Sequence, residues 1–152
     1  MPKLDHDWDF PDPHTIAVTV AAEDIDGLQH TNNTVYIRWC ELAAWSHSAS
    51  LGLDLTRYQQ LDRAMAMTHC DYQYLQATRQ EEELLVSTWI TTWDRRLTMQ
   101  RCLQIIRPVD SATILRGSMK FVCIELSSGR PRRLPPEFIK AYGPAVISND
   151  PS

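Results

Sequence analysis

The sequence predicts an α+β fold in which a curled antiparallel sheet of about five strands wraps around one long helix. Residues 34–51 combine good helix formers with a glycine just beyond their end, whereas five other segments alternate apolar and polar side chains as strands do. The short connections between the last four of these segments favour antiparallel pairing. A helix of about seventeen residues is roughly 25 Å long, which suits a sheet that wraps around it.

The helix and the segment before it form the first half of this pattern. Residues 14–23 carry alternating β-branched side chains and predict the first strand. A turn-rich, polar segment follows at 24–33 and leads into the helix, for which Asn32 or Asn33 is the expected cap and Gly52 the stop.

The second half of the pattern is strand-rich. After a polar link at residues 52–63, four strands are expected, then a turn, then a short helix that begins with proline. The strands are predicted at 64–76, 84–93, 97–107 and 112–126, the turn at 127–131 and the short helix at 135–142.

Length and composition set the class of protein. A chain of 152 residues, 43% hydrophobic and 22% charged, is expected to form one domain with its own core, with residues 1–13 and 144–152 as loose termini. No apolar run is long enough to span a bilayer, and the first residues lack a signal-peptide pattern. The four cysteines lie far apart and lack the spacing of zinc ligands: Cys40, Cys70, Cys102 and Cys123. We therefore expect them to be reduced core residues, the protein to be cytoplasmic, and no metal to be bound.

The predicted helix is apolar on most sides, with Arg38 and Glu41 as its charged residues. Such a helix must be covered by other structure, so we expect Glu41 to be buried and to need an ion pair or hydrogen bond. A single sheet curled on one helix also leaves an unpaired edge and an apolar face. Sheets of this kind pair into dimers, so we expect a homodimer.

Charge is distributed unevenly along the chain. Residues 95–140 hold ten basic and three acidic side chains, a balance of +7 within a chain whose net charge is −4. A basic segment can recognise phosphates or an acidic protein, although arginines alternating along a strand more often simply face solvent. The negative net charge and the lack of a nucleic-acid-binding motif argue against long nucleic acids.

The polar chemistry concentrates between Asp24 and Glu41. Asparagines and a threonine lie where a helix is expected to begin, and a helix N-terminus presents unpaired backbone N–H groups with the positive end of the helix dipole behind them. Asp26 lies seven residues before Asn33, close enough for the turn to bring its carboxylate to the same place. Taken alone, Asp24 and Asp26 are more often turn or capping residues than catalysts.

Five residues of this segment resemble a known motif. Asp26, His30, Asn32, Asn33 and Tyr36 match the pattern of the hot-dog-fold acyl-CoA thioesterases of the 4-hydroxybenzoyl-CoA thioesterase type, and the stretch is also similar to that of the acyl-carrier-protein thioesterases. The resemblance implies a hot-dog fold and thioester hydrolysis. It implies that Asp26 is the nucleophile or the general base, that the Asn33 backbone amide polarises the carbonyl, and that His30 belongs to the catalytic group.

The same resemblance implies how substrate is held. Asn32 and Tyr36 would contact it, strand residues Thr68 and His69 of the second subunit would complete a pocket between subunits, and the turn with Arg95 and Arg96 would hold the coenzyme A phosphates. Coenzyme A is then part of the substrate, and no cofactor is needed. Dimers of this family often associate further, so the resemblance also implies a tetramer.

Two segments depart from the family pattern. Leu28 and Gln29 replace residues that relatives often carry before the histidine, and residues 76–78 stand where many relatives have a proline-containing turn. Three functions therefore stay open: an acyl-CoA thioesterase, an acyl-carrier-protein thioesterase that docks its acidic carrier on residues 95–140, and a non-catalytic acyl-binding module. A dehydratase is disfavoured because the helix carries no matching histidine motif.

Overall fold

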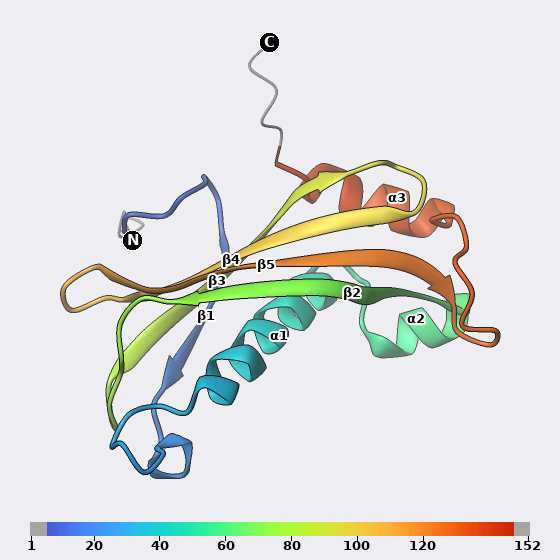
Figure 1. Cartoon of the computed structure of the whole chain (residues 1–152). Coiled ribbons are helices and arrows are strands. Elements are labelled where there is room, and N and C mark those ends of the chain that lie inside the picture. The colour runs from blue at the N-terminus through green and yellow to red at the C-terminus, as the bar shows by residue number, and fades with distance from the viewer. Residues whose placement is uncertain (1–5, 148–152) are drawn as a thin grey trace. The chain divides into compact units, whose positions relative to one another are not determined.

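The computed structural model describes residues 6–147 and contains one five-stranded antiparallel sheet with the strand order β1-β3-β4-β5-β2 (Figure 1). The long helix α1 lies against this sheet, which confirms the predicted fold class. In chain order the elements are β1 (His14–Thr19), a 3₁₀ turn η1 (Ala22–Asp24), α1 (Asn33–Ser50), α2 (Leu55–Leu61), β2 (Arg63–Tyr74), β3 (Glu83–Trp93), β4 (Thr98–Arg107), β5 (Ala112–Glu125), α3 (Pro136–Tyr142) and η2 (Gly143–Ala145).

The predicted elements are present with small shifts at their ends. β1 stops at Thr19 rather than Glu23, because the chain turns into η1 there. One helix was missed: the polar link at 52–63 contains α2, which is capped by the Asp54 side chain accepting from the backbone N–H of Arg57 at 2.8 Å. A seven-residue helix shows too little apolar periodicity to be recognised in the sequence.

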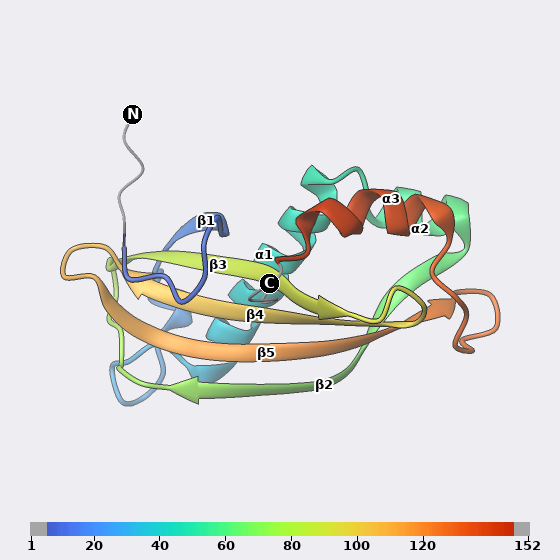
Figure 2. The ribbon, with the colours of Figure 1, turned by 90° about the horizontal axis from the view of Figure 1, so that it is seen from above.

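Long strands and α1 contribute residues to two compact units of the chain. Unit 1 comprises residues up to Ala44, Tyr72–Thr88 and Leu103–Gly117, and unit 2 comprises Trp45–Asp71, Trp89–Cys102 and the residues from Ser118 onward. Figure 2 shows β3, β4, β5 and β2 running alongside one another in the order of the sheet.

Unit 1 has a core of aliphatic and aromatic side chains and a tethered N-terminal segment. β1 pairs with β3 from His14 opposite Thr88 to Thr19 opposite Glu83. The buried Gln104 amide contacts residues 7 and 9 of the N-terminal segment, and Arg116 forms an ion pair with Asp9 at 2.7 Å. Asp7 and Asp9 are therefore attached to β4 and β5, although the sequence predicts a loose terminus there. The buried apolar residues of unit 1 include Val35, Tyr36, Trp39, Cys40, Leu84, Val86, Leu103, Ile105, Ile106, Ile114 and Leu115.

Unit 2 has its own core where α2, α3 and three strands meet. Phe138 and Tyr142 of α3 are fully buried in it, beside Tyr58 of α2. The backbone N–H of Ile147 donates to Ile90 at 2.9 Å, so residues 144–147 are attached to β3 and not loose. The remaining residues of the predicted loose C-terminus, 148–152, lie outside the described part of the chain.

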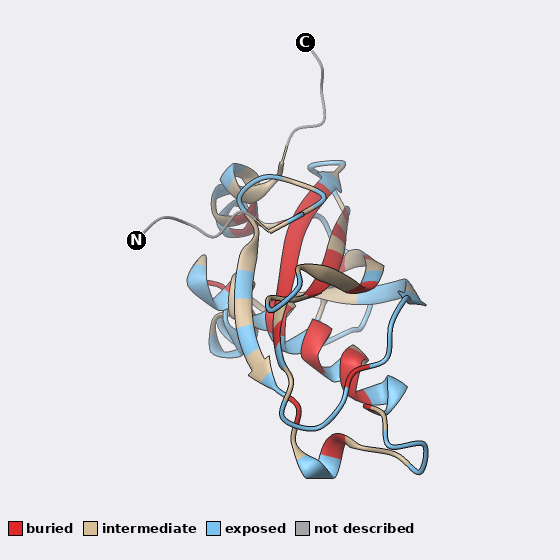
Figure 3. Cartoon of the chain, turned by 90° about the vertical axis from the view of Figure 1, so that its left-hand side faces the viewer, coloured by how far each residue is buried: buried red, intermediate tan, exposed pale blue. Residues whose placement is uncertain are grey.

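Helix α1 carries exposed as well as buried residues, so it is less covered than its composition predicts. Figure 3 colours the chain by burial, with buried residues in red and exposed residues in pale blue. Arg38, Glu41, Leu42 and Trp45 form an exposed stripe at spacings of three and four residues, and Glu41 therefore needs no buried partner. The prediction of a buried Glu41 is wrong, because sequence cannot show which side of an apolar helix the sheet covers.

The prediction that the cysteines lie in the core is confirmed for only some of them. Cys40 and Cys123 are buried, and burial raises the pKa of their thiols to about 12 and about 11. Cys102 is half-buried, whereas Cys70 is exposed on β2, so the prediction of a core position is wrong for Cys70. None of the four is joined in a disulfide. Among the residues described, no helix is both long and apolar enough to cross a membrane.

Candidate active site

The turn that carries Asp26 is closed by its own backbone. Ile25 and Thr31 form an isolated antiparallel bridge, and inside it the Asp26 N–H donates to the His30 carbonyl at 2.8 Å. The Asp26 carboxylate accepts from the Leu28 N–H at 2.8 Å through Oδ1. We name residues 25–31 the Asp26 turn. The turn places a half-buried carboxylate and the half-buried His30 at the surface of unit 1.

Helix α1 begins immediately after the Asp26 turn. The Asn32 side chain caps it, because Oδ1 accepts from the N–H of Thr34 at 3.0 Å and from its hydroxyl at 2.9 Å. Asn33 is the first helical residue and is exposed. Its N–H belongs to the first turn, where backbone donors lack intrahelical acceptors and the helix dipole favours negative charge. A developing oxyanion could be stabilised at this point.

Asp24 forms contacts that hold the fold together. It is buried, and its carboxylate accepts from the Ala21 N–H at 2.8 Å and pairs with Arg38 of α1 at 3.1 Å. The Asp24 carbonyl also accepts from the Asn32 N–H at 2.8 Å. These contacts attach the chain before the Asp26 turn to the start of α1, as the structural interpretation of Asp24 expected.

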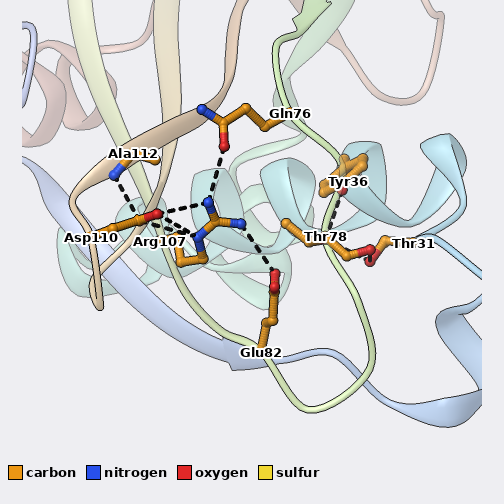
Figure 4. Close-up of polar contacts among 8 residues, drawn as sticks. All are labelled: Thr31, Tyr36, Gln76, Thr78, Glu82, Arg107, Asp110 and Ala112. Atoms are coloured by element: carbon orange, nitrogen blue, oxygen red, sulfur yellow. Dashed lines mark hydrogen bonds and ion pairs between the residues drawn. The ribbon is translucent and has the colours of Figure 1, made fainter.

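Tyr36 and Thr31 meet at a buried threonine of the β2–β3 connection (Figure 4). The Thr78 hydroxyl lies 2.6 Å from the Thr31 hydroxyl and 2.7 Å from the Tyr36 hydroxyl. Tyr36 is only 3% exposed, and its ring also packs edge-on against Trp39. The hydroxyl of Tyr36 therefore serves the protein's own structure, and contact between Tyr36 and substrate stays a prediction.

The other predicted site residues belong to unit 2. Thr68 and His69 lie on β2, an edge of the sheet, and both are exposed. The Thr68 hydroxyl donates to the Lys120 carbonyl at 3.2 Å, and the His69 ring lies 3.9 Å from the Asp71 carboxylate. The two side chains are thus presented on an unpaired strand edge, which is a surface that another strand can join.

Arg95 and Arg96 lie in the tight β3–β4 turn, exposed to solvent. The Asp94 carboxylate organises this turn by accepting from the N–H groups of Arg96, Leu97 and Thr98 at 2.8 to 2.9 Å. Desolvation raises the pKa of Asp94, but these backbone hydrogen bonds outweigh it and hold the pKa well below its usual range. The negative charge of Asp94 is thereby satisfied within the turn.

The segment that precedes α3 adds a basic side chain next to this turn. The Leu134 N–H donates to the Arg96 carbonyl at 2.7 Å, which brings the backbone after Arg133 beside the turn. Arg133 is exposed, as are Arg95 and Arg96. Three other cations of the basic region pair with carboxylates: Arg107 with Asp110, Arg116 with Asp9 and Arg132 with Glu125.

Unit 2 also contains a buried polar group that we name the Arg101 cluster, consisting of Arg101, His47, Ser48, Tyr58 and Tyr142. The Arg101 guanidinium lies 2.8 Å from His47 Nδ1 and donates to the Ser48 hydroxyl at 3.1 Å. Ser48 lies 2.9 Å from the Tyr142 hydroxyl, which is also hydrogen-bonded to the Tyr58 hydroxyl. Burial lowers the pKa of Arg101, and burial together with the Tyr142 hydroxyl raises that of Tyr58.

The curled sheet around one helix, with a carboxylate turn entering that helix, defines a hot-dog fold of the thioesterase type. Residues 20–142 match the family described as the Thioesterase-like superfamily, so the chain belongs to that family. It is 30% identical over 81 residues to Protein THEM6 of Xenopus laevis; the match covers 53% of this chain and 39% of the frog protein's length.

Solved structures share the fold at low identity. A 1,4-dihydroxy-2-naphthoyl-CoA thioesterase from Synechocystis is 21% identical with a TM-score of 0.77, covering 86% of this chain and 95% of its own. A Staphylococcus aureus protein solved in complex with CoA is 18% identical with a TM-score of 0.80, covering 91% and 89%. The 12:0-ACP thioesterase from Umbellularia californica is 15% identical with a TM-score of 0.80, covering 90% and 55%.

Three contacts at the site were not foreseen from the sequence: Arg38 with Asp24, and Thr31 and Tyr36 with Thr78. The first joins residues fourteen positions apart. Thr78 lies more than forty positions from its partners, and its segment stood out only as a departure from the family pattern. Nothing in one sequence marks such a distant partner.

Proposed function

We propose that the protein is an acyl-CoA thioesterase that hydrolyses an acyl-CoA to the free acid and CoA. The observation that carries the proposal is the placement of the Asp26 carboxylate in a turn that leads directly into the N-terminus of α1. Asp26 acts as nucleophile or general base, and the Asn33 N–H polarises the thioester carbonyl. His30, on the same turn, completes the catalytic group, and Asn32 and Tyr36 border the substrate.

The active unit in this proposal is a homodimer. β2 is an edge strand whose residues 67–71 are exposed, and pairing with β2 of a second copy would cover that edge. Thr68 and His69 of the second copy then border the acyl group. Association of dimers into a tetramer and a cytoplasmic location stay predictions.

Coenzyme A is anionic, and Arg95 and Arg96 are exposed donors that suit its phosphates. Because Asp94 is hydrogen-bonded within its own turn, it competes less for these arginines. The same side chains with Arg133 also favour a second function, hydrolysis of acyl-carrier-protein thioesters, because an acidic carrier would dock on exposed cations. The proposal includes no metal and no cofactor.

The test is thiol release from aryl, short-chain and long-chain acyl-CoAs and from matching acyl-carrier-protein thioesters, with Asp26→Asn and Asp54→Asn compared. Turnover that Asp26→Asn abolishes and Asp54→Asn retains supports the proposal, since Asn can replace Asp as a helix cap. Faster, salt-sensitive turnover of carrier-linked substrates would favour the second function. Binding of acyl-CoA without turnover would instead identify a non-catalytic acyl-binding module.

A further inference from the structure

The connection between β2 and β3 contains one buried residue among exposed ones. Residues 75–77 and 79–81 are exposed, whereas Thr78 is 0% exposed. A small polar side chain that is fully buried in a surface connection must satisfy its hydrogen bonds within the protein. The partners of Thr78 therefore indicate what this connection holds in place.

Those partners lie close in sequence to the candidate catalytic residues, since Thr31 follows His30 directly and Tyr36 comes three residues after Asn33. The Thr78 carbonyl accepts from the Thr31 N–H at 2.9 Å and from the Thr31 hydroxyl at 3.3 Å. The Thr78 hydroxyl lies 2.6 Å from the Thr31 hydroxyl and 2.7 Å from that of Tyr36. Thr31 closes the Asp26 turn, and Tyr36 lies in the first turn of α1, so one residue joins the two parts of the site.

Arg107 of β4 fixes the connection on either side of Thr78 (Figure 4). Its guanidinium donates to the Gln76 side chain at 3.0 Å and pairs with Glu82 at 3.5 Å. Asp110 holds the guanidinium in turn, with a closest contact of 2.8 Å. The hydrogen bond to Asp110 and the negative charge of Asp110 raise the pKa of Arg107. The hydrogen bond to Arg107 and the positive charge of Arg107 in turn lower the pKa of Asp110, as expected for a charge-assisted pair.

We propose that Thr78 is a positioning residue for thioester hydrolysis, which fixes the Asp26 turn relative to the first turn of α1. The inference rests on the proposed function of Asp26 and Asn33. Catalysis by a carboxylate and a backbone amide requires both to meet the same carbonyl, and small displacements of such groups are costly. Loss of the Thr78 hydroxyl removes the one group that joins the hydroxyls of Thr31 and Tyr36. Thr31 then keeps only the Thr78 carbonyl, Tyr36 loses its link to Thr78, and the two parts of the site can shift.

The kinetic test compares Thr78→Val, which keeps the shape and removes the hydroxyl, with Thr78→Ser, which keeps the hydroxyl. We expect kcat of Thr78→Val to fall roughly 10- to 100-fold, with KM within about twofold. Thr78→Ser should restore kcat to within about threefold of the unmodified protein, since its hydroxyl can make the same contacts. The matched control is Thr91→Val, because Thr91 is 6% exposed and donates to the Gln100 carbonyl at 3.3 Å in unit 2.

Amide hydrogen exchange provides a readout independent of turnover. In Thr78→Val the amides of Asp26, Gln29 and Asn32, which are hydrogen-bonded within or beside the turn, should exchange at least about tenfold faster, while unit 2 amides keep their rates. Unchanged exchange, or equal acceleration in both units, would overturn the positioning role. If the unmodified protein hydrolyses no thioester, the proposed function fails, and exchange alone still decides whether Thr78 orders the turn.

Discussion

The Asp26 turn of unit 1 and the Arg101 cluster of unit 2 use polar side chains in opposite ways. In the turn, the half-buried carboxylate and His30 lie where a ligand can reach them, and the backbone holds them in place. In the cluster, a guanidinium that is 3% exposed bonds to buried neighbours. The comparison teaches that polar groups available for chemistry are supported by backbone contacts, whereas polar groups that support the fold satisfy one another.

Asp26→Asn should separate the two regions most strongly. We expect turnover to fall roughly 10²- to 10⁴-fold, because an amide is a poor nucleophile and base. The free energy of unfolding should change by less than about 0.5 kcal/mol, since the Asn oxygen can still accept from the Leu28 N–H. Thiol release and urea unfolding measure the two quantities. A stability loss as large as the activity loss would contradict the assignment.

Arg101→Met should show the reverse pattern. Removing a buried guanidinium leaves the Ser48 hydroxyl and His47 Nδ1 with fewer partners, and we expect the free energy of unfolding to fall by about 3 kcal/mol. Turnover per folded molecule should stay within about twofold at low temperature, because stability and chemistry are carried by different regions. Urea unfolding measures the stability, and thiol-release assays about 10 °C below the thermal midpoint of the variant measure the turnover. Turnover that falls more than stability would place the cluster in the chemistry.

Replacing both Arg95 and Arg96 by Ala should raise KM for acyl-CoA about tenfold, or about 1.4 kcal/mol, and leave kcat nearly unchanged. The reason is that the arginines hold the phosphates away from the reacting carbonyl. Steady-state kinetics at low and high salt measure the effect, which should shrink as salt rises. Lys140→Ala, an exposed cation on α3, is the control. An equal rise in KM in the control would show a general charge effect.

The smallest expected effect concerns the stability that Asp94 contributes through the β3–β4 turn and how this stability depends on pH. Asp94→Ala removes an acceptor of three backbone N–H groups, and we expect a cost of about 0.5 to 1 kcal/mol at pH 7. Because the folded-state pKa of Asp94 is lowered, its contribution is fully present above the unfolded pKa of about 3.9. It is lost as pH falls through the lower folded-state pKa.

Urea unfolding of Asp94→Ala and the unmodified protein between pH 7 and pH 2 follows this loss. The difference between the two should narrow at the acidic end. A difference that grows on acidification would mean that the carboxylate of Asp94 is not stabilised in the folded state.

The local part of the candidate site could be predicted because it is continuous in sequence. The cap at Asn32, the start of α1 at Asn33 and the preceding turn depend on interactions between residues at most a few positions apart. The sequence-based prediction that Glu41 is buried was wrong for the opposite reason. Its exposure depends on which side of α1 the sheet covers, and this is decided by residues far away in the chain.

The sequence by itself determined the α+β class, the order of the strands along the chain, the long helix and the segment that holds Asp26, since alternation, capping and turn signals act over short distances. Tertiary structure alone decided the strand order β1-β3-β4-β5-β2, the burial of Thr78 between Thr31 and Tyr36, and the Arg101 cluster. These features join residues tens of positions apart. The free energy of such contacts depends on packing and desolvation, which appear only when the chain is folded.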